Sequence, residues 1–107
     1  MTDVFKALSD PTRRRILLML AEEPNSINSI SDHFNMSRPA VSKHIRILSD
    51  AQLLTIRSDE TDGRQRNCYI QLEALKEVND YIDTLERFWK SKLHGLGHYL
   101  SRKDSPS

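Results

Sequence analysis

Apolar residues recur every three or four positions through most of this chain, which is the spacing of amphipathic helices. We predict a short first helix that is capped by Thr2. Its apolar side consists of Val4, Phe5 and Leu8. A second helix is predicted from Pro11 to about Ala21, because Asp10 is a favourable N-cap and proline is tolerated at the first helical position.

A third, short helix is predicted after the polar loop that follows Ala21. Asn28 or Ser29 is the expected cap, and Ile30 and Phe34 lie on the expected buried side. Ile27, just before this helix, is expected to add one short extended pairing. A three-residue turn then leads directly into another helical pattern.

The helix predicted from Ser37 to Asp50 divides clearly into an apolar and a polar side. Ser37 is a good N-cap, and a proline so early in a helix removes no needed backbone donor. The apolar side holds Val41, His44, Ile45 and Leu48, and the opposite side holds Pro39, Ser42, Lys43 and Arg46. Two short helices joined by a tight turn form a helix-turn-helix, whose second helix lies in the DNA major groove. An ordinary surface helix with a solvated basic face is the alternative.

Three consecutive arginines, at positions 13 to 15, lie on the second predicted helix. Successive helical residues point about 100° apart, so these three side chains cannot face one phosphate together. We therefore expect at least one of them to be structural or solvated.

A β-hairpin is predicted directly after the helix-turn-helix. The ranges 53–57 and 68–72 have the composition of strands, and Asp62-Gly63 is a turn signal between them. A hairpin in this place is a wing, and Arg64 and Arg66 just beyond its turn are positioned to reach DNA phosphates or a minor groove. The alternative is a solvated loop in which these arginines pair with the acidic residues of the turn. Those acidic residues are Asp59, Glu60 and Asp62.

One long helical pattern runs from Glu73 to about Leu100, with more apolar surface than a small domain can cover. We expect this helix, together with the first helix, to pair with a second copy of the chain. The expected dimer contacts are Val4, Phe5, Leu8, Val78, Ile82, Leu85, Phe88, Trp89 and Leu96. Residues 1–100 are thus read as one winged helix-turn-helix domain that is mainly helical, followed by a disordered tail, 101–107.

Net charge and the lack of long apolar runs limit the kinds of partner that this chain can bind. The net charge of the 107 residues is only +1, so DNA binding must rely on a local patch rather than on a uniformly basic surface. The first residues lack the profile of a signal peptide, and no apolar run is long enough to span a membrane. We therefore expect a cytoplasmic protein whose partners are double-stranded DNA and a second copy of itself, and not a membrane.

These features together resemble the ArsR/SmtB family of winged-helix transcriptional repressors. The resemblance rests on the segments 5–13 (Phe-Lys-Ala-Leu-Ser-Asp-Pro-Thr-Arg), 37–48 and 63–66 (Gly-Arg-Gln-Arg). It implies a homodimeric repressor that binds a palindromic operator, often in its own promoter. The segment 85–96 resembles the subgroup often encoded beside START-like (SRPBCC) proteins, whose members generally lack metal sites.

The resemblance also implies the residues that face DNA. They are Ser37, Arg38, Pro39, Ser42, Lys43 and His44 on the helix, with Arg64 and Arg66 on the wing. The helical period adds Arg46 but places His44 nearer the apolar side, so both DNA contact and buried packing remain open for this histidine. At Gln52 the family usually has glycine, and a left-handed backbone there would be mildly strained.

Many members of this family are switched by metals. Residues 27–30 contain no cysteine pair, and the histidine of an Asp-x-His motif is replaced by Leu85. His94 and His98 are four residues apart and can bind one ion, but two ligands make an incomplete site. We expect no cofactor and no metal. Metal-responsive repression through these two histidines is the alternative, and any inducer is unknown.

Cys68, the only cysteine, alternates with apolar strand residues and is expected to be a small buried hydrophobe.

Two other classes of protein are disfavoured, an enzyme and a winged helix that contacts only other proteins. An enzyme is not expected, because the chain has no nucleophile–base spacing and no glycine-rich phosphate loop. A winged helix used only for protein contacts would usually have lost its cations. Those cations, Lys43, Arg46, Arg64 and Arg66, are all present.

Overall fold

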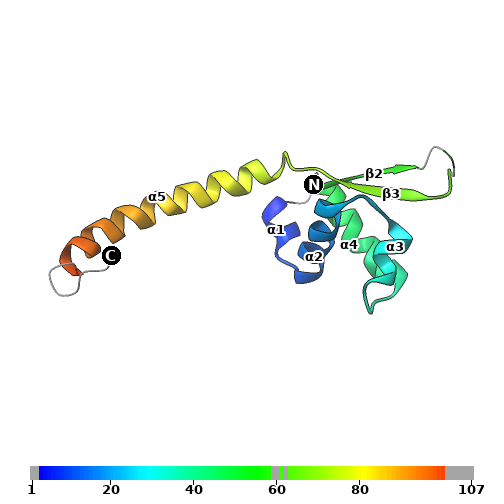
Figure 1. Ribbon diagram of the computed structural model, residues 1–107, viewed down its shortest axis with the longest axis horizontal. Helices are drawn as coiled ribbons and strands as arrows, with labels where there is room; N and C mark the ends of the chain where they lie inside the picture. Colours follow the sequence, from blue (N-terminus) through cyan, green and yellow to red (C-terminus); the bar gives the residue numbers. More distant parts are fainter. Residues whose placement is uncertain (1–2, 59–60, 62, 101–107) are drawn as a thin grey trace. The chain divides into compact units, whose positions relative to one another are not determined.

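The computed structural model describes residues 3–58, 61 and 63–100, with side chains as far as His94. The chain divides into two units, one ending at Lys76 and the other beginning at Glu77. In the first unit, helices α1 to α4 gather on one side of the β2–β3 hairpin (Figure 1). Thr2 and the expected disordered tail, 101–107, lie outside the described residues.

The first two helices lie at the start of the chain. Helix α1 (Val4–Leu8) has Asp3 at its N-cap position, where no side-chain hydrogen bond is made, so the expected cap at Thr2 lies one residue too early. Helix α2 (Pro11–Glu22) begins as predicted. The Asp10 carboxylate accepts a hydrogen bond from the backbone N–H of Arg13 at 3.0 Å, and proline occupies the first turn.

The third helix begins earlier than the sequence indicated. Helix α3 (Ile27–Asp32) is capped by Ser26, whose hydroxyl accepts from Ser29 N–H at 3.1 Å, so the expected cap at Asn28 or Ser29 is wrong. The extended pairing expected at Ile27 occurs just before it, in strand β1 (Asn25–Ser26). Ser26 is extended, with φ −73° and ψ 156°, and this conformation suits both a strand end and an N-cap.

Helix α4 (Arg38–Asp50) matches the predicted bounds. The Ser37 hydroxyl accepts from Ala40 N–H at 3.3 Å, as expected of an N-cap. At its other end Gln52 has a φ of 61°, which is the left-handed conformation in which a residue with a Cβ is mildly strained. Leu53 N–H donates to Leu48 carbonyl and Gln52 N–H to Ser49 carbonyl, both at 2.9 Å, which is a Schellman ending.

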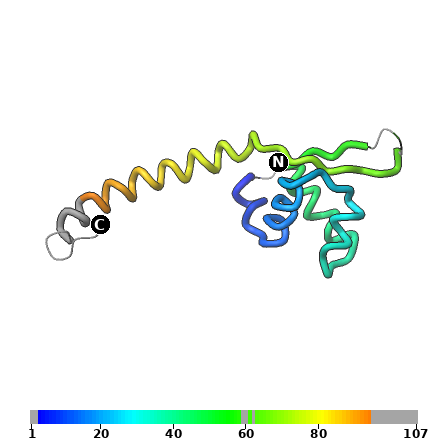
Figure 2. The backbone as a smooth tube through the Cα atoms, viewed as in Figure 1, coloured from blue at the N-terminus to red at the C-terminus, as the bar shows by residue number. Residues whose placement is uncertain are grey.

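Three antiparallel strands form one small sheet in the order β1-β3-β2. Strand β2 (Leu54–Ser58) starts one residue later than predicted, because Leu53 belongs to the helix ending, and strand β3 (Arg66–Ile70) starts two residues earlier than predicted. Arg57 opposes Asn67 in this register, and Ser58 opposes Arg66. The backbone trace in Figure 2 shows the two hairpin strands running side by side.

The core of the first unit draws on most of these elements. Its largest fully buried side chains are Ile16, Leu20, Ile30, Val41, Ile45, Leu48, Leu53, Leu54 and Cys68. Three of them belong to α4, so this helix is held by its apolar side and turns its other side outward. Leu72, the last residue of the predicted second strand, is 59% exposed because β3 ends before it.

Helix α5 (Leu75–Leu100) makes up the described part of the second unit, apart from its first two residues. It begins two residues after the predicted start, because Glu73 and Ala74 form a turn. Its large apolar side chains from Tyr81 to Leu93 are all at least 40% exposed. No helix within the described part of the chain is both long and apolar enough to cross a membrane.

Candidate nucleic-acid interface

The outward side of α4 carries most of the predicted DNA-contact residues. Five of them are exposed: Ser37, Arg38, Pro39, Lys43 and Arg46. Ser42 is partly exposed. The opposite side, Val41, Ile45 and Leu48, is buried. The helix therefore presents a polar, cationic strip to solvent, and its buried apolar side fixes which residues of the helix face outward.

His44 points away from this strip. Its side chain is 18% exposed, and its Nδ1 lies 3.1 Å from Arg13 Nη1 and 4.0 Å from Asp10 Oδ2. A guanidinium can only donate, so Nδ1 accepts this hydrogen bond and the ring proton of the neutral form lies on Nε2. Of the two roles left open for His44, this geometry favours packing inside the protein.

Arg13 joins His44 to the first helix. Its Nε donates to the Ala7 carbonyl at 2.7 Å and its Nη2 to the Lys6 carbonyl at 3.2 Å. Both carbonyls lie in the last turn of α1, where the Lys6 carbonyl also accepts from the backbone N–H of Ser9 at 3.1 Å and from its hydroxyl at 2.7 Å. The guanidinium of Arg13, on α2, thus forms hydrogen bonds both to the end of α1 and to a side chain of α4.

The Asp10 carboxylate completes this cluster. Partial burial raises its pKa, but the backbone N–H of Arg13 and the charges of His44 and Arg13 act more strongly together, so the net pKa is lowered. The ionised carboxylate is therefore the form that the folded chain stabilises.

The other two consecutive arginines also contact their own chain. Arg14 Nη1 donates to the Leu8 carbonyl at 2.8 Å, and the Arg15 guanidinium lies 5.0 Å from the centre of the Phe34 ring. The expectation that at least one of the three is structural is confirmed, and all three have an intramolecular partner.

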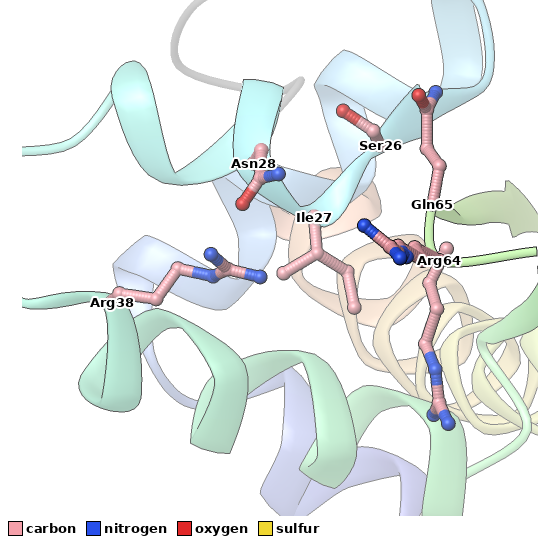
Figure 3. Close-up of a pocket in the computed structure, with 7 residues that line it drawn as sticks. Ser26, Ile27, Asn28, Arg38, Arg64 and Gln65 are labelled. Atoms are coloured by element: carbon pink, nitrogen blue, oxygen red, sulfur yellow. The ribbon is translucent and has the colours of Figure 1, made fainter. Parts of the chain in front are cut away.

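A hollow of about 180 Å³ separates the start of α4 from the wing. We call it the arginine hollow, and its lining residues are Ser26, Ile27, Asn28, Arg38, Arg64, Gln65 and Arg66. Figure 3 shows Arg38 reaching in from α4 on one side of Ile27 and Arg64 lying on the other side. Three of the predicted DNA-contact arginines are thereby brought together, from segments that are 26 residues or more apart in the chain.

A second hollow, of about 370 Å³, lies along the middle of α4. Its lining residues are Ile27, Ser42, Ile45, Arg46, Ser49, Asp50, Ile56 and Arg66. It shares Ile27 and Arg66 with the arginine hollow. The cationic strip of α4 and the wing therefore border two adjoining depressions.

Known regulatory proteins are similar to this chain in sequence. A model of the arsR family of bacterial regulatory proteins matches residues 10–55, from the cap of α2 into β2. The HTH-type transcriptional regulator Rv2034 of Mycobacterium tuberculosis is 33% identical over 96 residues, which cover 90% of this chain and 84% of that protein. The chain belongs to the arsR family. It is a DNA-binding transcriptional regulator that uses a helix-turn-helix.

Further transcriptional regulators are similar to this chain in sequence or in fold. The transcriptional repressor SdpR of Bacillus subtilis is 46% identical over 64 residues, covering 60% of this chain and 68% of the repressor. The crystal structure of an ArsR family transcriptional regulator matches with a TM-score of 0.74 at 32% identity, over 81% of this chain and 87% of that one. The crystal structure of a possible transcriptional regulator for arsenical resistance matches with a TM-score of 0.72 at 32% identity, over 92% of this chain and 96% of that one. The predicted winged-helix fold class is confirmed.

Sequence reasoning missed part of the interface of this arsR-family chain. Ser26, Asn28 and Gln65 line the arginine hollow and were not among the expected contacts. The sequence predicts Asn28 as a candidate cap, whereas it lies in the first turn of α3 beside the hollow. Its signal in the sequence was weak, because the hollow exists only once β1 pairs with β3.

Cys68 and the histidines bear on the alternative of metal sensing within the arsR family. Cys68 is fully buried, as predicted, and burial raises the pKa of its thiol to about 11, so a reactive thiolate is disfavoured at neutral pH. Among the described residues, no three metal-ligand side chains come together. His94 is exposed on α5, and the side chain of His98 lies outside the described part of the chain.

Proposed function

We propose that this arsR-family regulator is a homodimeric repressor that binds a palindromic operator, often in its own promoter, and that its binding does not require a metal. As expected for a DNA-binding repressor, we place it in the cytoplasm. The resemblance of residues 85–96 to the subgroup without metal sites supports metal independence.

The arginine hollow is the observation that carries the proposal of DNA contact by the wing as well as by α4. Arg38, Arg64 and Arg66 come together there, and none of the seven lining residues is acidic. A solvated basic helix would carry its cations on one element only. Cations that gather from two separate elements are better explained by contact with the phosphates of a polyanion. The expected contacts on α4 continue this surface. They are Ser37, Pro39, Ser42, Lys43 and Arg46.

Dimerisation is supported by the apolar side of α5. Ile82, Leu85 and Trp89 recur at spacings of three and four residues and are 43%, 48% and 62% exposed. A second copy of the same helix is the occupant that we propose, because this spacing is the seam of a coiled coil. From α1, Phe5 and Leu8 are partly exposed and remain candidates, whereas Val4 is 4% exposed and belongs to the core of its own chain. Val78, Phe88 and Leu96 stay proposed contacts, and the side chain of Leu96 lies outside the described part of the chain.

An electrophoretic mobility-shift series tests this function. The protein is titrated onto its own promoter and onto unrelated duplexes at moderate salt, each with EDTA and again with added zinc. We expect a retarded complex that forms more tightly on the promoter and is the same with EDTA and zinc. No complex on any duplex would contradict DNA binding, and a zinc-dependent complex would favour sensing through His94 and His98.

A further inference from the structure

We propose that the arginine hollow is a binding site for a single phosphate group, shared by the start of α4 and the wing. This inference rests on the proposed function, because the phosphate that we assign to it is one of the DNA backbone. The shared chemistry is that of a tetrahedral oxyanion, which a free phosphate group also supplies.

The first argument is the charge of the hollow. Three arginines line a space of about 180 Å³, and among the residues that the structure describes no carboxylate lines it. Like charges brought around one space repel each other, and an anion between them reverses the sign of that interaction. A guanidinium also offers a planar set of N–H donors that matches the oxygens of a phosphate.

The second argument is the size and the neutral lining of the hollow. About 30 Å³ is the share of one water in the liquid, so the space holds a phosphate group and a few waters. Ser26 and Asn28 add a hydroxyl and an amide that can donate to an oxyanion. Figure 3 shows Asn28 next to the space between Arg38 and Ile27.

The third argument is that the position of the lining residues is set by the fold. Ser26 opposes Asn67 in the pairing of β1 with β3, which places the start of α3 beside the first residues of β3. The Gln65 amide donates to the Asn67 side chain at 3.1 Å, so the residue between Arg64 and Arg66 is tied to the same strand. One phosphate held here would bridge the helix-turn-helix and the wing.

The salt dependence of binding distinguishes one shared phosphate from three separate ones. Affinity for a labelled duplex is measured by fluorescence anisotropy over a range of salt, for the wild type and for the triple variant Arg38→Ala/Arg64→Ala/Arg66→Ala. Loss of one phosphate contact lowers the slope of log K against log salt by about 0.9 per bound chain, and loss of three lowers it by about 2.7. We expect about 0.9. Arg57→Ala is the control, since its guanidinium lies 5.2 Å from the centre of the Tyr69 ring and does not line the hollow.

Asn28→Asp tests the neutral lining without removing an arginine. A carboxylate of nearly the same shape would occupy the phosphate site, and we expect duplex affinity to fall on the order of tenfold. Asn79→Asp, on the exposed surface of α5, adds the same charge elsewhere and is expected to change affinity much less. An effect of equal size in both variants would overturn the site.

Inorganic phosphate, added without DNA, identifies the source of the phosphate group. Amide shifts at Ser26 and Asn28 that the triple variant loses, with competition against the duplex, would support the site for free phosphate. Absence of such shifts, with the slope change of one phosphate, would support the site for DNA alone. A slope change near 2.7, or one equal to that of Arg57→Ala, would overturn the inference while leaving the proposed function intact. Failure of the wild type to bind any duplex would instead contradict the proposed function.

Discussion

His44 illustrates how two kinds of sequence evidence can disagree about a single side chain. It lies within the helix that carries the cationic strip, yet its ring contacts Arg13 and approaches Asp10 on the far side of that helix. The helical period placed His44 near the apolar seam, and the family resemblance placed it on DNA. The contact with Arg13, 31 residues away in sequence, favours the packing role, and no local pattern carries that information.

Asp10 is the residue for the first prediction, because its carboxylate caps α2 and lies beside Arg13 and His44. Asp10→Ala is expected to lower the free energy of unfolding by about 1 kcal/mol through the lost cap. Asp10→Asn, which keeps a capping oxygen, is expected to cost less. Denaturant unfolding followed by circular dichroism measures both variants.

The same carboxylate has a defined pH dependence. Its pKa is lowered in the folded chain, so its contribution is complete above the unfolded value of about 3.9 and is lost as the pH falls through the folded value. The wild type is therefore expected to lose more stability than Asp10→Asn below about pH 4. Parallel losses in the two proteins would show that the carboxylate has no special role.

At the scale of elements, local signals were sufficient where the partners are neighbours in sequence. The caps Asp10 and Ser37 were found because each bonds to an N–H three residues on. The cap of α3 and the strand bounds were shifted because they depend on β1 pairing with β3, some 40 residues away. A pairing of that range fixes register through contacts that no short window contains.

The ending of α4 supplies the prediction for an element. Gln52 occupies the left-handed position of a Schellman ending, which costs a residue with a Cβ roughly 1 kcal/mol relative to glycine. Gln52→Gly is expected to raise the free energy of unfolding by about that amount, and thus the melting temperature by several degrees. Gln52→Ala keeps the Cβ and serves as the control. If both variants melt together, the backbone at this position is not strained.

At the scale of the whole molecule, the fold could be predicted in outline but the arginine hollow could not. The order of helices, wing and long last helix follows from periodicity and turn residues along the chain. The hollow requires Asn28, Arg38 and Arg64 to meet, and these belong to three different segments. Candidate contacts on one helix can be read from its period, whereas a site shared between elements depends on how they pack.

The proposed assembly of two chains depends on the apolar side of α5. Leu85→Glu or Trp89→Glu would place a charge in the proposed apolar seam, where it loses hydration without gaining a partner. Sedimentation of each variant is expected to show dissociation to monomers, with a parallel loss of DNA affinity because two recognition helices no longer act together. Ser91→Glu adds the same charge on another side of the same helix and is expected to remain dimeric. A dilution series of the wild type tests dimerisation without any variant, so the test does not depend on whether the variants fold. A folded wild-type monomer at micromolar concentration would contradict the proposed dimer.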